Sequence, residues 1–171
     1  KVTLVSGPVS LPKPEGVDMV RVKTAVQMLE ACEAAFETAD ISLFAAAVAD
    51  MRPEHVADCK LKKGQADADL GTIKLVENPD ILKTLASRKG PHQVVVGFAA
   101  ETNDVIANAQ KKLEKKKADV IVANRVGEGL AFGTDDNTVF FVDREEVEEL
   151  PTMSKSRLAD VILDRALEYA Q

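Results

Sequence analysis

The amino-acid sequence predicts an α/β fold: a doubly wound, mostly parallel Rossmann-like sheet with helices on both faces and a protruding β-hairpin. From Val2 onward, short apolar runs alternate with amphipathic helical segments, which is the pattern of repeated βαβ units. The run from Ile41 to Ala47 is apolar except for Ser42, as expected of a strand that helices cover on both faces. Polar residues follow several of these runs, at the strand ends where such sheets bind ligands.

The first stretch of the chain predicts two strands, a helix and a third strand. The first two strands are expected at Val2–Val5 and Met19–Val22, with a proline-containing loop between them. Thr24 should begin the helix, because Gln27 stands three residues later and completes a capping box. The apolar run Ile41–Ala47 should then form a central strand of the sheet.

A hairpin and a helix are predicted next. Two short alternating segments, Lys60–Lys63 and Thr72–Val76, flank the polar loop Gly64–Gly71, and this arrangement is typical of a β-hairpin. Asn78-Pro79-Asp80 predicts a helix start, because Asn caps free N–H groups, Pro suits the first turn and Asp complements the helix dipole. That helix should run to about Ser87.

The second half of the chain continues the alternation of strands and helices, and the expected helices carry apolar residues at helical spacing. The expected elements are a strand at Val94–Phe98, a helix at about Asn103–Lys117, strands at Val120–Ala123 and Thr138–Val142, and a helix at Lys155–Tyr169. No repeat, low-complexity tract or linker interrupts this order. We therefore expect a single domain over residues 1–171.

Composition excludes several classes of protein. The longest apolar run is too short to span a bilayer. The net charge of −6 argues against nucleic-acid binding, which relies on a basic surface. Cys32 and Cys59 are the only cysteines, so neither a disulfide framework nor a structural zinc site is expected. We expect a cytoplasmic protein that binds neither membranes nor nucleic acid.

Residues with useful chemistry stand at the ends of predicted elements. Asp50 follows the third predicted strand, Phe98 ends the strand that begins at Val94, and Asn124 ends the next one. The helix that begins at Asn78 would offer free amides to phosphate oxygens. A ligand site with phosphate chemistry is therefore conceivable at this edge of the sheet.

Each of these features also has an ordinary structural explanation. Motifs such as Asn78-Pro79-Asp80 are usually only helix caps, and a phenylalanine such as Phe98 is more often a core residue than a stacking surface. Lys112 and Lys116 stand four residues apart and share a helix face, which by default is simply solvated. The sequence contains no P-loop, dinucleotide fingerprint or nucleophile elbow. Single residues therefore leave the activity open.

Seven motifs taken in order carry a family resemblance. They are LVSGPV (4–9), AAVADMRP (46–53), KLKK (60–63), NPDIL (78–82), VGFAAET (96–102), IVAN (121–124) and AFGTDDN (131–137). Together they resemble the phosphopantothenoylcysteine synthetase domain, and the resemblance covers essentially the whole chain. In bacteria that domain is usually fused behind a flavin-dependent phosphopantothenoylcysteine decarboxylase.

The resemblance implies a phosphopantothenate–cysteine ligase of coenzyme A biosynthesis. In such a ligase the carboxylate of 4'-phosphopantothenate attacks the α-phosphate of CTP, and the amine of cysteine then displaces CMP from the acyl-cytidylate. The resemblance also implies Mg²⁺ with the nucleotide, a homodimer, and FMN only where a decarboxylase precedes the domain. The bacterial-type motifs point to CTP, whereas the eukaryotic counterparts are associated with ATP.

Site residues can be carried over from the family motif by motif. Lys60 is the expected catalytic residue, acting on the reacting centre from the hairpin. Backbone groups near Ala46 and Asp80 should read the cytosine, while Lys112 and Lys116 should meet phosphates. The resemblance names no metal ligands. The implied nucleotide-binding residues are Ala46, Ala47, Asp50, Lys60, Pro79, Asp80, Ile81, Leu82, Phe98, Lys112 and Lys116.

The sequence departs from the family pattern in two places. The family's first strand and Gly-rich segment would precede Lys1, so we expect a ligase domain that lacks this part and has impaired turnover. Arg125 stands where Asp is common. The competing interpretations are a non-catalytic nucleotide-binding or interaction module of the same fold and a nicotinamide oxidoreductase. The missing glycine fingerprint counts against the oxidoreductase.

Overall fold

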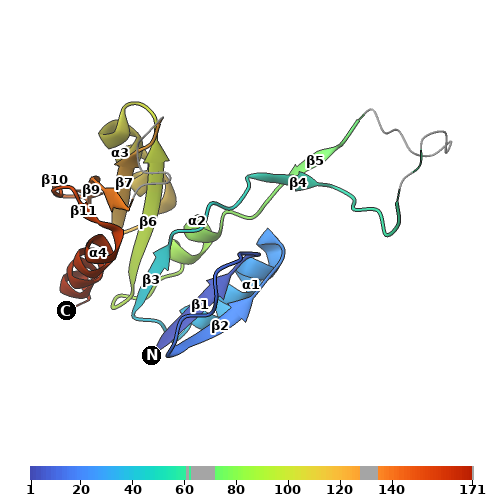
Figure 1. Cartoon of the computed structure of the whole chain (residues 1–171), viewed down its shortest axis with the longest axis horizontal. Helices are drawn as coiled ribbons and strands as arrows, with labels where there is room; N and C mark the ends of the chain where they lie inside the picture. Colours follow the sequence, from blue (N-terminus) through green and yellow to red (C-terminus); the bar gives the residue numbers. More distant parts are fainter. Residues whose placement is uncertain (61, 63–71, 128–134, 171) are drawn as a thin grey trace. The chain divides into compact units, whose positions relative to one another are not determined.

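The computed structural model describes residues 1–60, 62, 72–127 and 135–170, which form two compact units (Figure 1). Unit 1 combines Lys1–Ala31 with Ala47–Asp80, and unit 2 combines Cys32–Ala46 with Ile81–Gln171. No helix among the described residues is both long and apolar enough to cross a membrane.

Unit 1 begins with two parallel strands and the start of a helix. Strand β1 (Val2–Ser6) pairs in parallel with β2 (Val17–Arg21), and α1 (Ala25–Phe36) follows. Thr24 Oγ1 accepts a hydrogen bond from Gln27 N at 3.2 Å, and Gln27 Oε1 accepts one from Thr24 N at 3.3 Å. This reciprocal pair is the predicted capping box, which is confirmed.

An antiparallel strand pair is present in unit 1 as predicted, but its first strand lies earlier in the sequence than predicted. Strand β4 (Met51–Pro53) pairs antiparallel with β5 (Leu75–Glu77). The predicted second strand, Thr72–Val76, overlaps β5. Lys60, predicted to open the first strand, lies in no strand, and residues 61 and 63–71 lie outside the described residues.

Strand pairing at the base of the hairpin explains this shift. Asn78 N donates to Asp50 O at 2.7 Å, so the ladder starts at Asp50. It continues beyond Pro53, where Glu54 N donates to Lys74 O at 2.9 Å. A proline is tolerated in such a two-stranded ribbon, in which each strand has one open edge. Pro53 can therefore be the last residue of β4.

Unit 2 contains a five-stranded sheet in the order β10-β9-β7-β6-β3. Strands β3, β6 and β7 are parallel, β9 runs antiparallel to β7, and β10 runs antiparallel to β9. The strands are β3 (Ile41–Phe44), β6 (Val94–Glu101), β7 (Val120–Arg125), β9 (Val139–Val142) and β10 (Val147–Glu149). The predicted α/β fold class is confirmed.

Helices and a small ribbon complete unit 2. The helices are α2 (Ile81–Ala86), α3 (Val105–Lys116) and α4 (Lys155–Tyr169). Strands β8 (Asp136–Asn137) and β11 (Met153–Ser154) form a short antiparallel pair. Ser154 then caps α4, because its side chain accepts a hydrogen bond from Arg157 N at 3.3 Å.

The prediction that Ile41–Ala47 forms a central strand is wrong. Strand β3 ends at Phe44 and lies at one end of the five-stranded sheet. An apolar run shows that a strand is covered, but it does not show how many strands pair with it. The run continues through small alanines beyond Phe44, and these residues follow the strand without extending it.

Helices cover both faces of the sheet in unit 2, as predicted. Side chains alternate between the two faces of a strand, so Val96 and Val122 pack with Leu158 and Ile162 of α4 on one face. On the other face, Gly97 lies against the Leu82 side chain of α2, and α3 packs on β6 and β7. The strand residues between these layers are almost fully buried.

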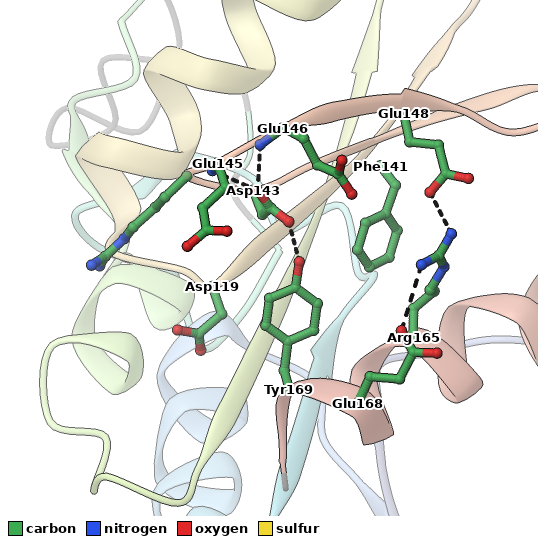
Figure 2. Close-up of a pocket in the computed structure, with 10 residues that line it drawn as sticks. Asp119, Phe141, Asp143, Glu145, Glu146, Glu148, Arg165, Glu168 and Tyr169 are labelled. Carbon is green, nitrogen blue, oxygen red and sulfur yellow. Dashed lines mark hydrogen bonds and ion pairs between the residues drawn. The ribbon is translucent and has the colours of Figure 1, made fainter.

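The end of α4 is joined to the turn between β9 and β10. Tyr169 donates a hydrogen bond from its hydroxyl to the Asp143 carboxylate, as Figure 2 shows. The other Asp143 oxygen accepts from Glu145 N at 2.7 Å and Glu146 N at 2.8 Å. Partial burial by itself would raise the pKa of Asp143, but these hydrogen bonds hold it below its usual value.

The close approach at Gly97 gives a first prediction. A Cβ atom at Gly97 would lie 2.8 Å from side-chain carbons of Leu82 and Ile121. We expect Gly97→Val to lower the free energy of unfolding in urea by about 1–3 kcal/mol through overpacking, although valine favours strands. Gly90→Ala is the control, because its nearest atom would be Gln93 Oε1 at 3.7 Å. Equal losses in both variants would contradict the packing argument.

The Tyr169–Asp143 hydrogen bond gives a second prediction. Because the pKa of Asp143 is lowered in the folded state, the bond stabilises the fold above the ordinary carboxyl pKa, and that stability is lost as Asp143 becomes protonated. Tyr169→Phe keeps the ring beside Phe141 and removes the hydroxyl. It should reduce unfolding free energy at pH 7, and the difference from wild type should shrink below about pH 3.9. A difference that does not change between pH 7 and pH 3 would disprove the linkage.

Candidate functional site

The carboxyl ends of β3, β6 and β7 meet at one edge of the sheet in unit 2, because these strands are parallel. Ala46 follows β3, Phe98 lies in the second half of β6, and Asn124 lies at the end of β7 beside Ala100. Ligands in open α/β sheets bind at this edge. The structure thus brings Ala46 and Asn124 to the expected edge, whereas Phe98, predicted to end its strand, lies three residues before the end of β6 at Glu101.

Lys112 of α3 reaches the backbone of β6. Its Nζ donates to the carbonyl oxygen of Phe98 at 2.7 Å, and its side chain is half-buried. The last register partner of β3 on β6 is Gly97, so this contact falls just beyond the end of β3. The hydrogen bond holds the ammonium group against the backbone of β6, just beyond the carboxyl end of β3.

The ring of Phe98 lies on the face of the sheet that α4 covers, opposite to the face on which α3 packs. It packs, half-buried, against the core cluster that includes Val96, Val122 and Leu158. Ile81 is buried, and Leu82 packs against Gly97. The Ile81 and Leu82 side chains therefore fill the core of unit 2, and a nucleotide would meet chiefly the backbone at these two residues.

Lys116 lies one helical turn beyond Lys112, in the last turn of α3. Helix α3 runs back from the carboxyl edge toward the start of β7, so the Lys116 backbone is about 6 Å farther from that edge. Its positive charge also complements the carboxyl end of the helix dipole. Lys116 and Lys112 share a face of α3 as predicted, but at different depths along the sheet.

Sequence reasoning did not single out Asn108, which organises the turn between β6 and α3. Its Nδ2 donates to Glu101 Oε2 at 3.0 Å and to Asn103 O at 3.1 Å. Asp104 in the same turn has a φ of 47°, in the left-handed region that L-residues rarely adopt. An asparagine in the first turn of a helix is a weak signal, which explains the omission.

In unit 1, Asn78 does not act as the predicted helix cap. Its Nδ2 donates to Ala49 O at 2.8 Å, and its Oδ1 accepts from Arg52 Nη1 at 3.2 Å. Helix α2 begins only at Ile81 and ends at Ala86, so the predicted helix from Asn78 to about Ser87 is too long. The polar side chain found a partner on a neighbouring segment, which the local pattern could not indicate.

The hydrogen bonds of Asn78 bring predicted site residues of unit 1 together. Asp50, with Ala47 nearby in sequence, lies on one side of the pairing, and Pro79 and Asp80 follow Asn78 on the other. Lys60 is exposed beyond β4, and the structure records no hydrogen bond or ion pair between it and the described residues. The structure does not test the predicted role of Lys60.

A cavity of unit 2 lies at the other edge of the sheet. It has a volume of about 610 Å³ and includes Asp119, which precedes β7, and Asp143, which follows the antiparallel strand β9 (Figure 2). Arg165 forms an ion pair with Glu148 at 2.5 Å in its wall. Carboxylates dominate the lining, so this cavity is unsuited to a triphosphate. None of the predicted site residues lines it.

A preformed metal centre is absent from the residues that the structure describes. No group of three or more His, Cys, Asp or Glu side chains there is arranged to hold a metal ion. Mg²⁺ commonly keeps several waters and binds through one or two carboxylates together with substrate phosphates.

Comparisons with known proteins agree on one family. The family model described as DNA/pantothenate metabolism flavoprotein C-terminal domain matches residues 1–169. The coenzyme A biosynthesis bifunctional protein CoaBC of Vibrio parahaemolyticus is 47% identical over 171 residues, which cover 98% of this chain and 42% of that protein. The chain thus spans less than half the length of this relative.

Solved structures give the same result. The crystal structure of the C-terminal domain of a CoaBC protein is 38% identical with a TM-score of 0.76, covering 96% of this chain and 71% of that one. A Cab2 variant in complex with phosphopantothenate-cysteine is 20% identical with a TM-score of 0.63, covering 91% and 54%, and this likeness concerns the fold alone. The resemblance found in the sequence motifs is confirmed, and the chain belongs to the family of DNA/pantothenate metabolism flavoprotein C-terminal domains.

Proposed function

We propose that this chain is the ligase domain of a coenzyme A biosynthesis protein and joins 4'-phosphopantothenate to cysteine with consumption of CTP. The observation that carries the proposal is the 47% identity over nearly the whole chain to a coenzyme A biosynthesis bifunctional protein. The fold neighbour with bound phosphopantothenate-cysteine is consistent with the same chemistry. A cytoplasmic homodimer is part of the proposal, and FMN belongs only to a fused decarboxylase.

The proposed reaction has two steps. A carboxylate oxygen of phosphopantothenate attacks the α-phosphorus of CTP, an O–P bond forms, and pyrophosphate leaves with the electron pair of the broken bond. The cysteine amine then attacks the acyl carbon, a C–N bond forms, CMP leaves with its electron pair, and the amine proton passes to solvent. Both steps crowd anionic oxygens together, so preorganised positive charge should lower both barriers.

The residues of this chain can supply that positive charge. The Lys112 ammonium is held at the carboxyl edge by its hydrogen bond to Phe98 O, where it would bind a phosphate oxygen, and Lys116 would bind another from the same helix. In unit 1, the backbone near Asp80 would read the base. Mg²⁺ would be held chiefly by triphosphate oxygens and would neutralise their charge.

Lys60 is proposed to act at the reacting centre. It is exposed on the hairpin segment beyond β4, and a flexible lysine ammonium can follow the charge that develops during attack on the α-phosphorus. This role comes from the family motif at residues 60–63. It needs a kinetic test.

The test uses the full-length parent protein with phosphopantothenate, cysteine, Mg²⁺ and either CTP or ATP. We expect pyrophosphate release that depends on phosphopantothenate and is faster with CTP. Lys60→Gln should reduce turnover by about 10²-fold or more, the usual scale for losing one transition-state donor. Lys62→Gln, an exposed lysine two residues away, should stay near wild type.

Two results would count against the proposal. Absence of pyrophosphate release with every nucleotide would leave the non-catalytic module as the function of this fold. Full turnover of Lys60→Gln would remove Lys60 from the reaction and leave the ligase assignment intact.

A further inference from the structure

At the base of the hairpin in unit 1, side-chain hydrogen bonds add to the first bond of the strand ladder. Asn78 N donates to Asp50 O at 2.7 Å, and Asn78 Nδ2 donates to Ala49 O at 2.8 Å. Arg52 Nη1 donates to Asn78 Oδ1 at 3.2 Å and to Glu77 O at 2.5 Å. We call these two side chains, Arg52 and Asn78, the base clamp.

The base clamp uses both functional atoms of the Asn78 side-chain amide. The oxygen accepts from the guanidinium, and the nitrogen donates to a backbone carbonyl. An amide with both ends engaged can take only one orientation, because a flip would place donor against donor and acceptor against acceptor. Arg52 therefore orients Asn78, and Asn78 fixes the Ala49 carbonyl.

The base clamp joins two segments that carry predicted nucleotide-binding residues. Ala49 and Asp50 belong to the first segment, which also contains Ala47, and Pro79 and Asp80 directly follow Asn78 in the second. The hydrogen bonds cross from Ala49 and Asp50 in the first segment to Asn78, which directly precedes Pro79 in the second. They set the spacing between the segments at the point where a ligand would contact both.

We propose that Asn78 and Arg52 are positioning residues of the nucleotide site, holding the Ala47–Asp50 segment and the Pro79–Asp80 segment at the separation that CTP requires. This inference rests on the proposed ligase function. Neither side chain need touch the nucleotide. Recognition of a base by backbone groups tolerates little misplacement, since an error of about 1 Å can cost about 10²-fold.

The base clamp could instead serve only to stabilise the hairpin, and the same hairpin offers a matched control. Lys74 forms an ion pair with Glu54 at 2.8 Å, farther along the same ladder. Lys74→Met removes this cross-strand contact without changing the base clamp. If the base clamp only stabilised the hairpin, Lys74→Met should change the KM and Kd for CTP as much as the clamp variants do.

Two clamp variants separate the possibilities in the full-length parent protein. Asn78→Asp keeps an acceptor for Arg52 but turns a carboxylate oxygen toward the Ala49 carbonyl, so the cross-segment bond becomes a repulsion. Arg52→Lys keeps the charge but loses the planar group that bonds both Glu77 O and Asn78 Oδ1. The milder Arg52→Lys keeps the test valid if Asn78→Asp folds poorly, as judged by circular dichroism and urea unfolding.

The experiment determines the KM for CTP and the KM for cysteine from turnover kinetics, and the Kd of CTP by calorimetry. We expect Asn78→Asp to raise the KM and Kd for CTP by about 10-fold or more, Arg52→Lys to raise them less, and the KM for cysteine to change by under about two-fold. Lys74→Met should match wild type. Equal CTP constants in the clamp variants and Lys74→Met would overturn the inference.

The two proposals fail in different ways. If the wild-type parent turns over no nucleotide, the ligase proposal fails. If the wild type is active and the clamp variants lose cysteine affinity as much as CTP affinity, only the positioning role fails.

Discussion

The parallel pairing of β6 with β3 and β7 is the constraint on which unit 2 and its part of the candidate site depend. Parallel strands place their carboxyl ends at one edge, so Ala46 and Asn124 gather there although they are far apart in sequence. The crossover helix α3 must then run back along β6, and this course brings Lys112 to the Phe98 carbonyl. The lysine is positioned by topology, because no local signal around residue 112 specifies its depth along the sheet.

Local signals predicted much of the fold correctly. The Thr24–Gln27 capping box formed as expected, and the apolar stripe of α3 buries Val105, Ala109 and Leu113. Such features involve residues within one or two turns, so the sequence around them contains all the partners. The pairing of β3 with β6 joins residues that lie 53 positions apart, such as Ile41 and Val94, and an apolar run does not identify its neighbours. This is why the run Ile41–Ala47 predicts a central strand, whereas β3 lies at the end of the sheet.

Asn78 shows why the candidate site was harder to predict than the fold. The asparagine before Pro79 and Asp80 has the short polar side chain that is preferred at helix caps. The same side chain is also favoured in turns, so its presence does not show whether a helix begins directly after it. In the folded unit, the Asn78 side chain instead donates to the carbonyl oxygen of Ala49 and accepts from the guanidinium of Arg52. The family motifs name expected site residues on both sides of these hydrogen bonds, but the motifs did not reveal the hydrogen bonds themselves.

The two edges of the sheet in unit 2 differ in charge, and this difference outweighs cavity size in locating the candidate site. At the amino edge, Asp119 is already engaged, since it accepts from Val95 N at 2.8 Å and pairs with Lys89. The cavity there is lined mostly by carboxylates, which would repel a triphosphate in a protein whose net charge is already −6. Beside the carboxyl end of β3, in contrast, a fixed ammonium group is present. For an anionic substrate, a positioned cation at an open edge is a better indicator of the site than an enclosed volume of the wrong sign.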